Sequence, residues 1–148
     1  MGKLLQTAEG ADVAFKVQEE TFRAHRVVLA ARSPVFEAEL YGPLREKSDG
    51  EAVIPVEDVH PDAFRALLHF IYTDSLPGDG EGCDAATLQH LLVAADRYGV
   101  DRLKHICEGK LRASADEKTV ASMLAIAERH NCPRLRDACL AIQVSIAS

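Results

Sequence analysis

The sequence contains no tryptophan, and its 148 residues include only five phenylalanines and three tyrosines. It also lacks a long apolar run, because no stretch approaches the roughly 20 residues that a membrane-spanning helix requires. The leading segment Met1-Gly2-Lys3-Leu4-Leu5 is too short for a signal peptide. We therefore expect a soluble protein of the nucleus or the cytoplasm that contacts no membrane.

Basic residues are in the minority, with 17 Lys and Arg against 23 Asp and Glu, which gives a net charge of −6 and a pI near 5.5. This balance leaves little basic surface for phosphate contacts, so no nucleic acid partner is expected. The four cysteines, at positions 83, 107, 132 and 139, show no C-x-x-C spacing. We interpret them as reduced thiols rather than as a disulfide framework.

Motifs for catalysis are also missing. The sequence contains no phosphate-binding glycine loop, no G-x-S-x-G and no H-E-x-x-H, so we predict no enzyme activity, no catalytic residues and no cofactor. Two alternatives are less favoured. His130, Cys132, Cys139 and Cys107 could bind a metal, but two of these thiols fall on apolar helical stripes. Cys107 and His105 could form a thiol nucleophile, but their side chains point to different faces of a helix.

What the sequence does contain is a short β-rich segment followed by helical patterns. Alternating apolar residues predict a strand over 12–17, and the polar turn after it predicts a hairpin with 21–24. A third strand, 52–56, contains Pro55, which has no N–H to donate and therefore favours a sheet edge. His25 lies at the corner where the hairpin passes into a helix, and we interpret it as structural.

The remaining segments predict helices. Ser33-Pro34 begins one that ends at Gly42-Pro43, and Pro61 begins the next. A glycine-rich acidic loop follows over 73–84. The last four helices are bounded by Gly99 as a C-terminal stop, Asp101 as a cap, Ser114 in a capping-box spacing, and Pro133 at a first turn. The predicted fold class is α+β, a small N-terminal sheet packed against stacked helical hairpins.

Three long blocks, ADVAFKV…ETFRAHRVVLAARSPVFEAEL, VHPDAFRALLHFIYTDSLP and LLVAADRYGVDRLKHICEGKL, resemble a BTB/POZ domain. The resemblance is closest to the BTB half of plant MATH–BTB proteins and of animal speckle-type adaptors. It implies the BTB/POZ fold over 1–113 and a short helical extension, the 3-box or BACK-like element, over 114–148. It also implies a non-catalytic module that homodimerises and binds cullin-3, so that a ubiquitin ligase assembles for substrate ubiquitination.

The resemblance implies a cullin-binding surface. Leu44 and Glu46 match the hydrophobic-x-Glu motif of cullin-binding relatives, with the leucine as an apolar anchor and the carboxylate as a hydrogen-bonding partner. Tyr72 and Tyr98 match positions in loops on the same surface. The alternative for these two tyrosines is that their rings are buried and close helix ends.

The resemblance also implies a dimer interface, made by Leu4 and Leu5 before the first strand and by Val27, Val28 and Ala31 of the following helix. Apolar residues with small neighbours at helical spacing let two such helices pack across a two-fold axis.

Asp12 and Arg26 match a structural charged pair near the base of the family's dimer. In relatives the substrate is bound by a MATH domain, which is absent from this sequence, so we expect either a fragment or a short form. The alternative function is a BTB oligomerisation module that recruits transcriptional regulators without a cullin.

Overall fold

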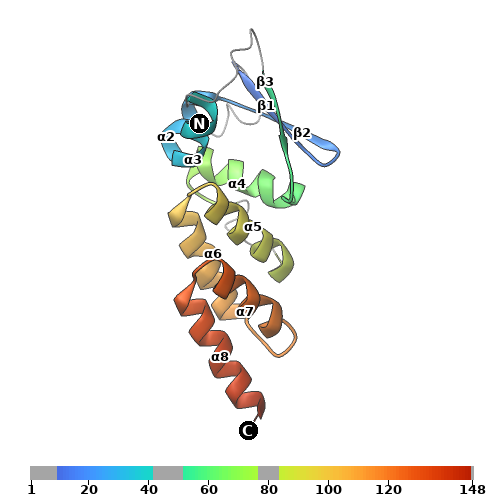
Figure 1. Cartoon of the computed structure of the whole chain (residues 1–148), viewed down its shortest axis with the longest axis vertical. Helices are drawn as coiled ribbons and strands as arrows, with labels where there is room; N and C mark the ends of the chain where they lie inside the picture. The colour runs from blue at the N-terminus through green and yellow to red at the C-terminus, as the bar shows by residue number, and fades with distance from the viewer. Residues whose placement is uncertain (1–9, 42–51, 77–83, 148) are drawn as a thin grey trace.

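The computed structural model describes residues 10–41, 52–76 and 84–147. In these ranges the three strands all end at or before Val56, and every element after them is a helix (Figure 1). In chain order they are β1 (Val13–Val17), β2 (Glu20–Ala24), α2 (Arg26–Arg32), α3 (Pro34–Tyr41), β3 (Ala52–Val56), α4 (Pro61–Thr73), α5 (Ala85–Arg97), α6 (Asp101–Ser114), α7 (Val120–Arg129) and α8 (Pro133–Ala147). The predicted α+β class is confirmed.

The sheet has the order β2-β1-β3. β1 and β2 pair antiparallel as the predicted hairpin, and Gln18 adopts a positive φ of 54° in the turn between them. β3 pairs with β1 in parallel and lies at an edge, with Pro55 opposite Lys16. The edge position predicted from the proline is therefore confirmed.

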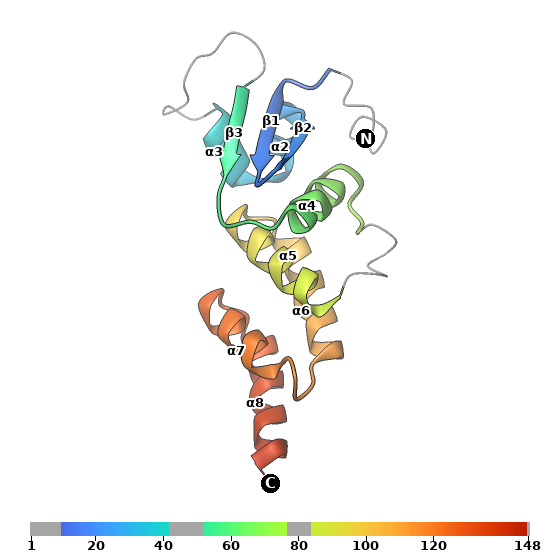
Figure 2. The same ribbon diagram turned by 90° about the vertical axis from the view of Figure 1, so that its right-hand side faces the viewer.

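Aromatic rings fill the contact between the sheet and α4. In Figure 2, α4 lies below the strands. The ring centroids of Phe15 in β1 and Phe64 in α4 lie 5.3 Å apart, and Phe36 of α3 lies 5.4 Å from Phe15. All three side chains are fully buried. These separations suit the offset and tilted arrangements that aromatic pairs prefer, so the sheet is fixed to the helices by interlocked rings.

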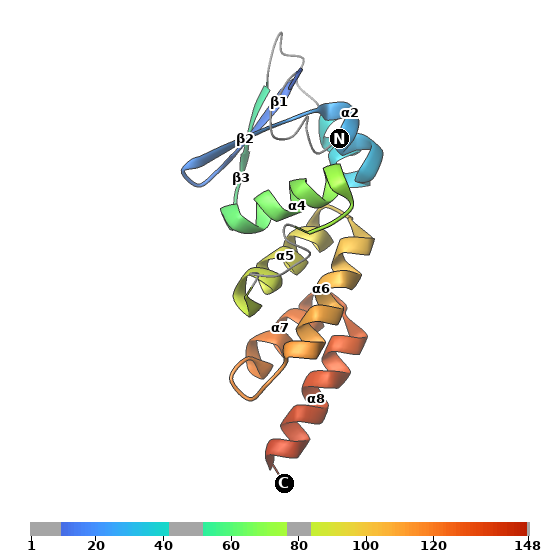
Figure 3. The same cartoon turned by 180° about the vertical axis from the view of Figure 1, so that it is seen from behind.

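The helices below α4 form successive layers, with α5 beside α6 and then α7 beside α8, so the molecule is elongated (Figures 2 and 3).

Gly99 ends α5 as predicted: its φ is +68°, and the N–H groups of Gly99 and Val100 bond back to the main-chain oxygens of Asp96 and Ala95. A Cβ at Gly99 would lie 3.1 Å from Pro34 Cγ, so a side chain there would be strained by the positive φ and crowded by the proline. No helix in the described ranges is long and apolar enough to cross a membrane.

Two predicted caps are wrong. Asp101 is the first residue of α6 rather than its cap, since the N-cap is Val100 and no side chain bonds there. Ser114 is the last residue of α6 rather than the start of α7. The turn before α7 is instead closed by Asp116, whose Oδ1 accepts from the N–H groups of Lys118 and Thr119 at 2.9 and 3.0 Å. At the start of α7 the error arises because Ser114, Asp116 and Thr119 compete for the helix end. At α6 the helix begins one residue earlier than predicted.

Candidate protein-interaction site

Helix α2 presents apolar side chains to solvent. Val27 is 72% exposed and Ala31, one turn later, is exposed as well, whereas Leu29 is fully buried. Val28 lies between these extremes and packs partly against the core. Exposed apolar residues at i and i+4 form a stripe on one helix face, which is the pattern expected of a surface that packs against another helix. Leu4 and Leu5, predicted to join this surface, lie outside the described residues.

The start of α2 is anchored by Asp12. Its Oδ1 accepts from the main-chain N–H of Arg26 at 2.8 Å, the first residue of the helix, where a carboxylate also complements the helix dipole. The Arg26 side chain is buried, and its Nε has no hydrogen-bond partner among the described residues. The contact between these two predicted partners therefore joins the Asp12 side chain to the Arg26 main chain. The described part of the chain contains no ion pair between their side chains.

Tyr72 is buried at the end of α4, with 3% of its surface exposed. Its hydroxyl accepts from the main-chain N–H of His25 at 2.8 Å and lies 2.7 Å from His25 Nδ1, to which it can donate. Burial raises the pKa of Tyr72, and the hydrogen bond from His25 only partly offsets this effect. The tyrosine thus fixes the corner where β2 passes into α2.

Tyr98, between α5 and α6, is 2% exposed. Its ring stacks on Phe36 at 4.3 Å and meets Phe64 edge-on at 6.1 Å, while its main-chain oxygen accepts from Ser33 Oγ. Burial raises the pKa of Tyr98 to about 12. A partner that approaches this region would contact the loops that these tyrosines support rather than the rings themselves. Leu44 and Glu46 lie outside the described residues.

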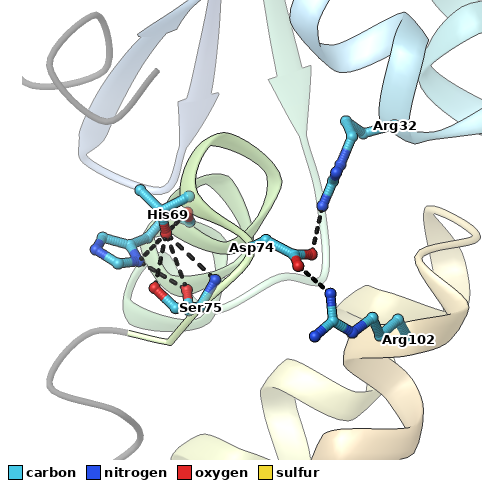
Figure 4. Close-up of polar contacts among 6 residues, drawn as sticks. Arg32, His69, Asp74, Ser75 and Arg102 are labelled. Atoms are coloured by element: carbon cyan, nitrogen blue, oxygen red, sulfur yellow. Dashed lines mark hydrogen bonds and ion pairs between the residues drawn. The ribbon is translucent and has the colours of Figure 1, made fainter.

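Three helices meet at Asp74, at the end of α4 (Figure 4). Its carboxylate pairs with Arg32 of α2 at 2.6 Å and with Arg102 of α6. The hydrogen bonds from Arg32 and then Arg102 lower the pKa of Asp74. The sequence placed this residue in a loop, and no local pattern indicates partners 42 and 28 residues away. The contact thus joins the end of α2, the helix that carries the apolar stripe, to α4 and α6.

Beside Asp74, the end of α4 is closed by a second polar group. Thr73 Oγ1 donates to the main-chain oxygen of His69 at 2.7 Å, and His69 Nδ1 lies 2.9 Å from the main-chain oxygen of Ser75 (Figure 4). Asp74 itself adopts a left-handed conformation with φ of 60°. These bonds join the last turn of α4 to the residues that follow it, and the Asp74 N–H bonds back to the main-chain oxygen of Phe70, so the cluster is a helix terminus.

Polar contacts also join α5 and α6 to the last two helices. Asp96 bonds Lys104 Nζ through Oδ1 and His130 Nδ1 through Oδ2, each at 2.8 Å. Burial alone would raise the pKa of Asp96, but the hydrogen bonds from Lys104 and His130 outweigh it and lower the pKa. Glu108 of α6 is buried, and its Oε1 accepts from the main-chain N–H of Leu135 at 3.0 Å, in the first turn of α8. The carboxylate thus caps a helix on another layer.

The structure also shows where the residues of the two alternative sites, the metal site and the thiol nucleophile, lie. His130 is bonded to Asp96, and Cys107, Cys132 and Cys139 are buried. Over the described ranges there is no group of three or more His, Cys, Asp or Glu side chains that could hold a metal ion. Burial raises the pKa of Cys132 and of Cys139, which favours the protonated thiol over the nucleophilic thiolate.

Comparison with known families agrees with this architecture. Residues 1–115 match the BTB/POZ domain, and residues 119–145 match the family described as "BPM/SPOP, BACK domain". The chain therefore belongs to the BTB/POZ family and carries a BACK element of the BPM/SPOP type. The resemblance inferred from the sequence is confirmed.

The similar proteins include two from Arabidopsis thaliana. "BTB/POZ and MATH domain-containing protein 3" is 43% identical over 152 residues, which covers 98% of this chain and 37% of the relative. "BTB/POZ and MATH domain-containing protein 4" is 42% identical over 150 residues, which covers 94% of this chain and 32% of the relative. The chain thus spans about a third of the length of the relatives that it matches.

Proposed function

We propose that this chain is the dimerising adaptor part of a cullin-3 ubiquitin ligase and that it performs no catalysis itself. The observation that carries the proposal is the succession of a BTB/POZ match and a BPM/SPOP BACK match in one chain. In this proposal the substrate is bound by a MATH domain of the kind that the relatives' names include. The chain then brings that substrate to the cullin.

The exposed stripe of α2 supports the dimer. Val27 at 72% exposure leaves apolar surface in water, which association across a two-fold axis would bury. Light scattering at micromolar concentration should give about twice the 16.1 kDa chain mass. Val27→Asp should give a monomer, because an unpaired charge buried in an interface costs several kcal/mol. Val53→Asp, at a 63% exposed valine of β3, is the matched control. A monomeric mass for the unmodified chain would contradict the proposed dimer.

Cullin binding is tested at the hydrophobic-x-Glu motif. Burial of Leu44 against a partner would contribute about 1.5–3 kcal/mol, and a charge-assisted bond from Glu46 about 1–2 kcal/mol. Calorimetry with the cullin-3 N-terminal domain should therefore show no measurable binding for Leu44→Ala combined with Glu46→Ala. The dimer mass should not change. Glu19→Ala, at an exposed position of the β1–β2 turn, is the control and should bind normally.

The same titration separates the two candidate functions. If the unmodified chain does not bind the cullin, the remaining function is an oligomerisation module that recruits transcriptional regulators. The proposal places the protein in the nucleus or the cytoplasm, and the buried thiols of Cys132 and Cys139, which form no disulfide among the described residues, support a reducing compartment. Imaging of a tagged chain in a secretory compartment would contradict that placement.

A further inference from the structure

A pocket of about 480 Å³ lies between α6 and the start of α8. This volume falls within the range of roughly 300–1,000 Å³ that ligand sites occupy. One face of α6 lines it through His105, Glu108, Gly109 and Arg112, which recur at helical spacing, and Arg134 lines it from the first turn of α8. None of these residues belongs to the α2 stripe or to the predicted cullin motif.

The pocket is basic although the chain is acidic. Lys104, Arg112 and Arg134 line it together with His105, against the single carboxylate of Glu108, whereas the whole chain carries a net charge of −6. Lys104 is already paired with Asp96, and Glu108 already bonds the Leu135 N–H. Within the described ranges, the side chains of His105, Arg112 and Arg134 make no hydrogen bond or ion pair. Two guanidinium groups are therefore available to a ligand.

Gly109 supports the assignment independently of charge. It lies inside α6, where glycine is disfavoured relative to alanine. Its φ is not in the left-handed region, and a Cβ built there would have no atom within 4 Å, so neither the backbone nor internal packing requires glycine. The position leaves bare main chain on the pocket wall, which lets another main chain approach closely.

We infer that this pocket binds an acidic peptide segment of a partner protein. Carboxylates of the peptide pair with Arg112 and Arg134, since the planar guanidinium matches a carboxylate with two parallel hydrogen bonds. The peptide main chain passes over Gly109. His105 and Arg112 are two helical turns apart, about 10 Å along α6, and this spread suits a segment with several carboxylates better than one compact anion. The inference goes beyond the proposed cullin adaptor, because it concerns another surface.

The binding test uses a fluorescein-labelled 12-residue peptide that alternates glutamate with glycine and serine. Fluorescence anisotropy with the full chain should show saturable binding that weakens as salt is added, because exposed ion pairs are screened. A peptide with glutamine at every glutamate position should not bind. Equal binding of the two peptides would overturn the inference. So would displacement of the labelled peptide by inorganic phosphate at micromolar concentration, which would indicate a site for a compact anion.

Variants locate the site. Arg112→Gln combined with Arg134→Gln should weaken peptide binding by at least about tenfold, through the loss of two charge-assisted contacts. Arg129→Gln with Lys118→Gln removes two exposed cations outside the pocket and should leave binding unchanged. Gly109→Gln keeps every charge, fills the open position and should also weaken binding. Unchanged affinity in the arginine variant, with normal helical circular dichroism, would overturn the inference.

Discussion

The two parts of the chain on either side of Gly99 are built from different side chains. All five phenylalanines and all three tyrosines occur at or before Tyr98, and the segment from Val100 to Ser148 contains none. The first part buries large rings in mutual contact, as Phe15, Phe36 and Phe64 do. The second part buries leucine, methionine, cysteine and alanine side chains.

The difference indicates how each part is stabilised. Interlocked rings contribute about 0.5–1.5 kcal/mol per pair beyond the area that they bury, so they stabilise the first part in a way that the second part lacks. The last two helices bury smaller side chains and add polar contacts to α5 and α6, through Asp96 with His130 and Glu108 with Leu135. We therefore expect α7 and α8 to depend on the first part, and the first part to depend little on them.

The strongest test of the comparison removes one large buried side chain from each part. Phe64→Ala should cost about 3–5 kcal/mol and unfold the whole chain, whereas Leu135→Ala should cost about 2–5 kcal/mol and loosen α7 and α8 first. Because every aromatic ring lies in the first part, near-ultraviolet circular dichroism reports on that part alone. Leu135→Ala should reduce the far-ultraviolet helical signal and preserve the near-ultraviolet one. Simultaneous loss of both signals would show that the two parts form one cooperative unit.

A second test breaks the link between α6 and α8, within the second part. Glu108→Ala leaves the Leu135 N–H at the start of α8 without its acceptor and should cost about 1–3 kcal/mol in urea unfolding. Glu108→Gln retains an amide oxygen at the same place and should cost less. If the two variants were equally stable, the carboxylate would not be capping α8.

A substitution at Gly109 should raise the stability of the chain rather than lower it. Gly109→Ala should stabilise the chain by about 1 kcal/mol, because alanine favours a helix interior and its Cβ meets nothing within 4 Å. Thermal unfolding followed at 222 nm measures the gain. A loss of stability would mean that Gly109 is required by α6 itself rather than by a ligand of the pocket.

The smallest expected effect is the pH dependence of the stability that Asp96 contributes. The pKa of Asp96 is lowered in the folded chain, so its contribution to stability is present above the unfolded pKa of about 3.9 and is lost as the pH falls through the folded value. With 34% of the side chain exposed, we expect under about 1 kcal/mol at neutral pH. In urea, the free energy of unfolding of Asp96→Asn should therefore be lower than that of the unmodified chain at pH 7, and the difference should be smaller at pH 3. A constant difference at both pH values would exclude the ionised carboxylate as the cause.

The sequence predicted the features that depend on neighbouring residues. The β1–β2 hairpin, the edge strand with Pro55, the stop at Gly99 and the start at Pro133 each follow from one local pattern. The links from Glu108 to Leu135 and from Asp96 to His130 join residues 27 and 34 positions apart, and periodicity carries no information about such pairs. The family resemblance identified α2 as a surface, and only the coordinates separate exposed Val27 from half-buried Val28.

The parallel pairing of β1 with β3 has a consequence for synthesis. Val13 pairs with Ala52, so the strand made first gains its second neighbour only after α2 and α3 have been translated. Until then β1 and β2 form a lone hairpin, which is marginal in water, and one edge of β1 remains open to other chains. Ribosome-bound chains that end before Ala52 should therefore be digested readily by protease, and those that extend beyond Tyr98 should resist it. Folding of the first part during translation then waits for β3 and for the later helices that bring Phe64 and Tyr98.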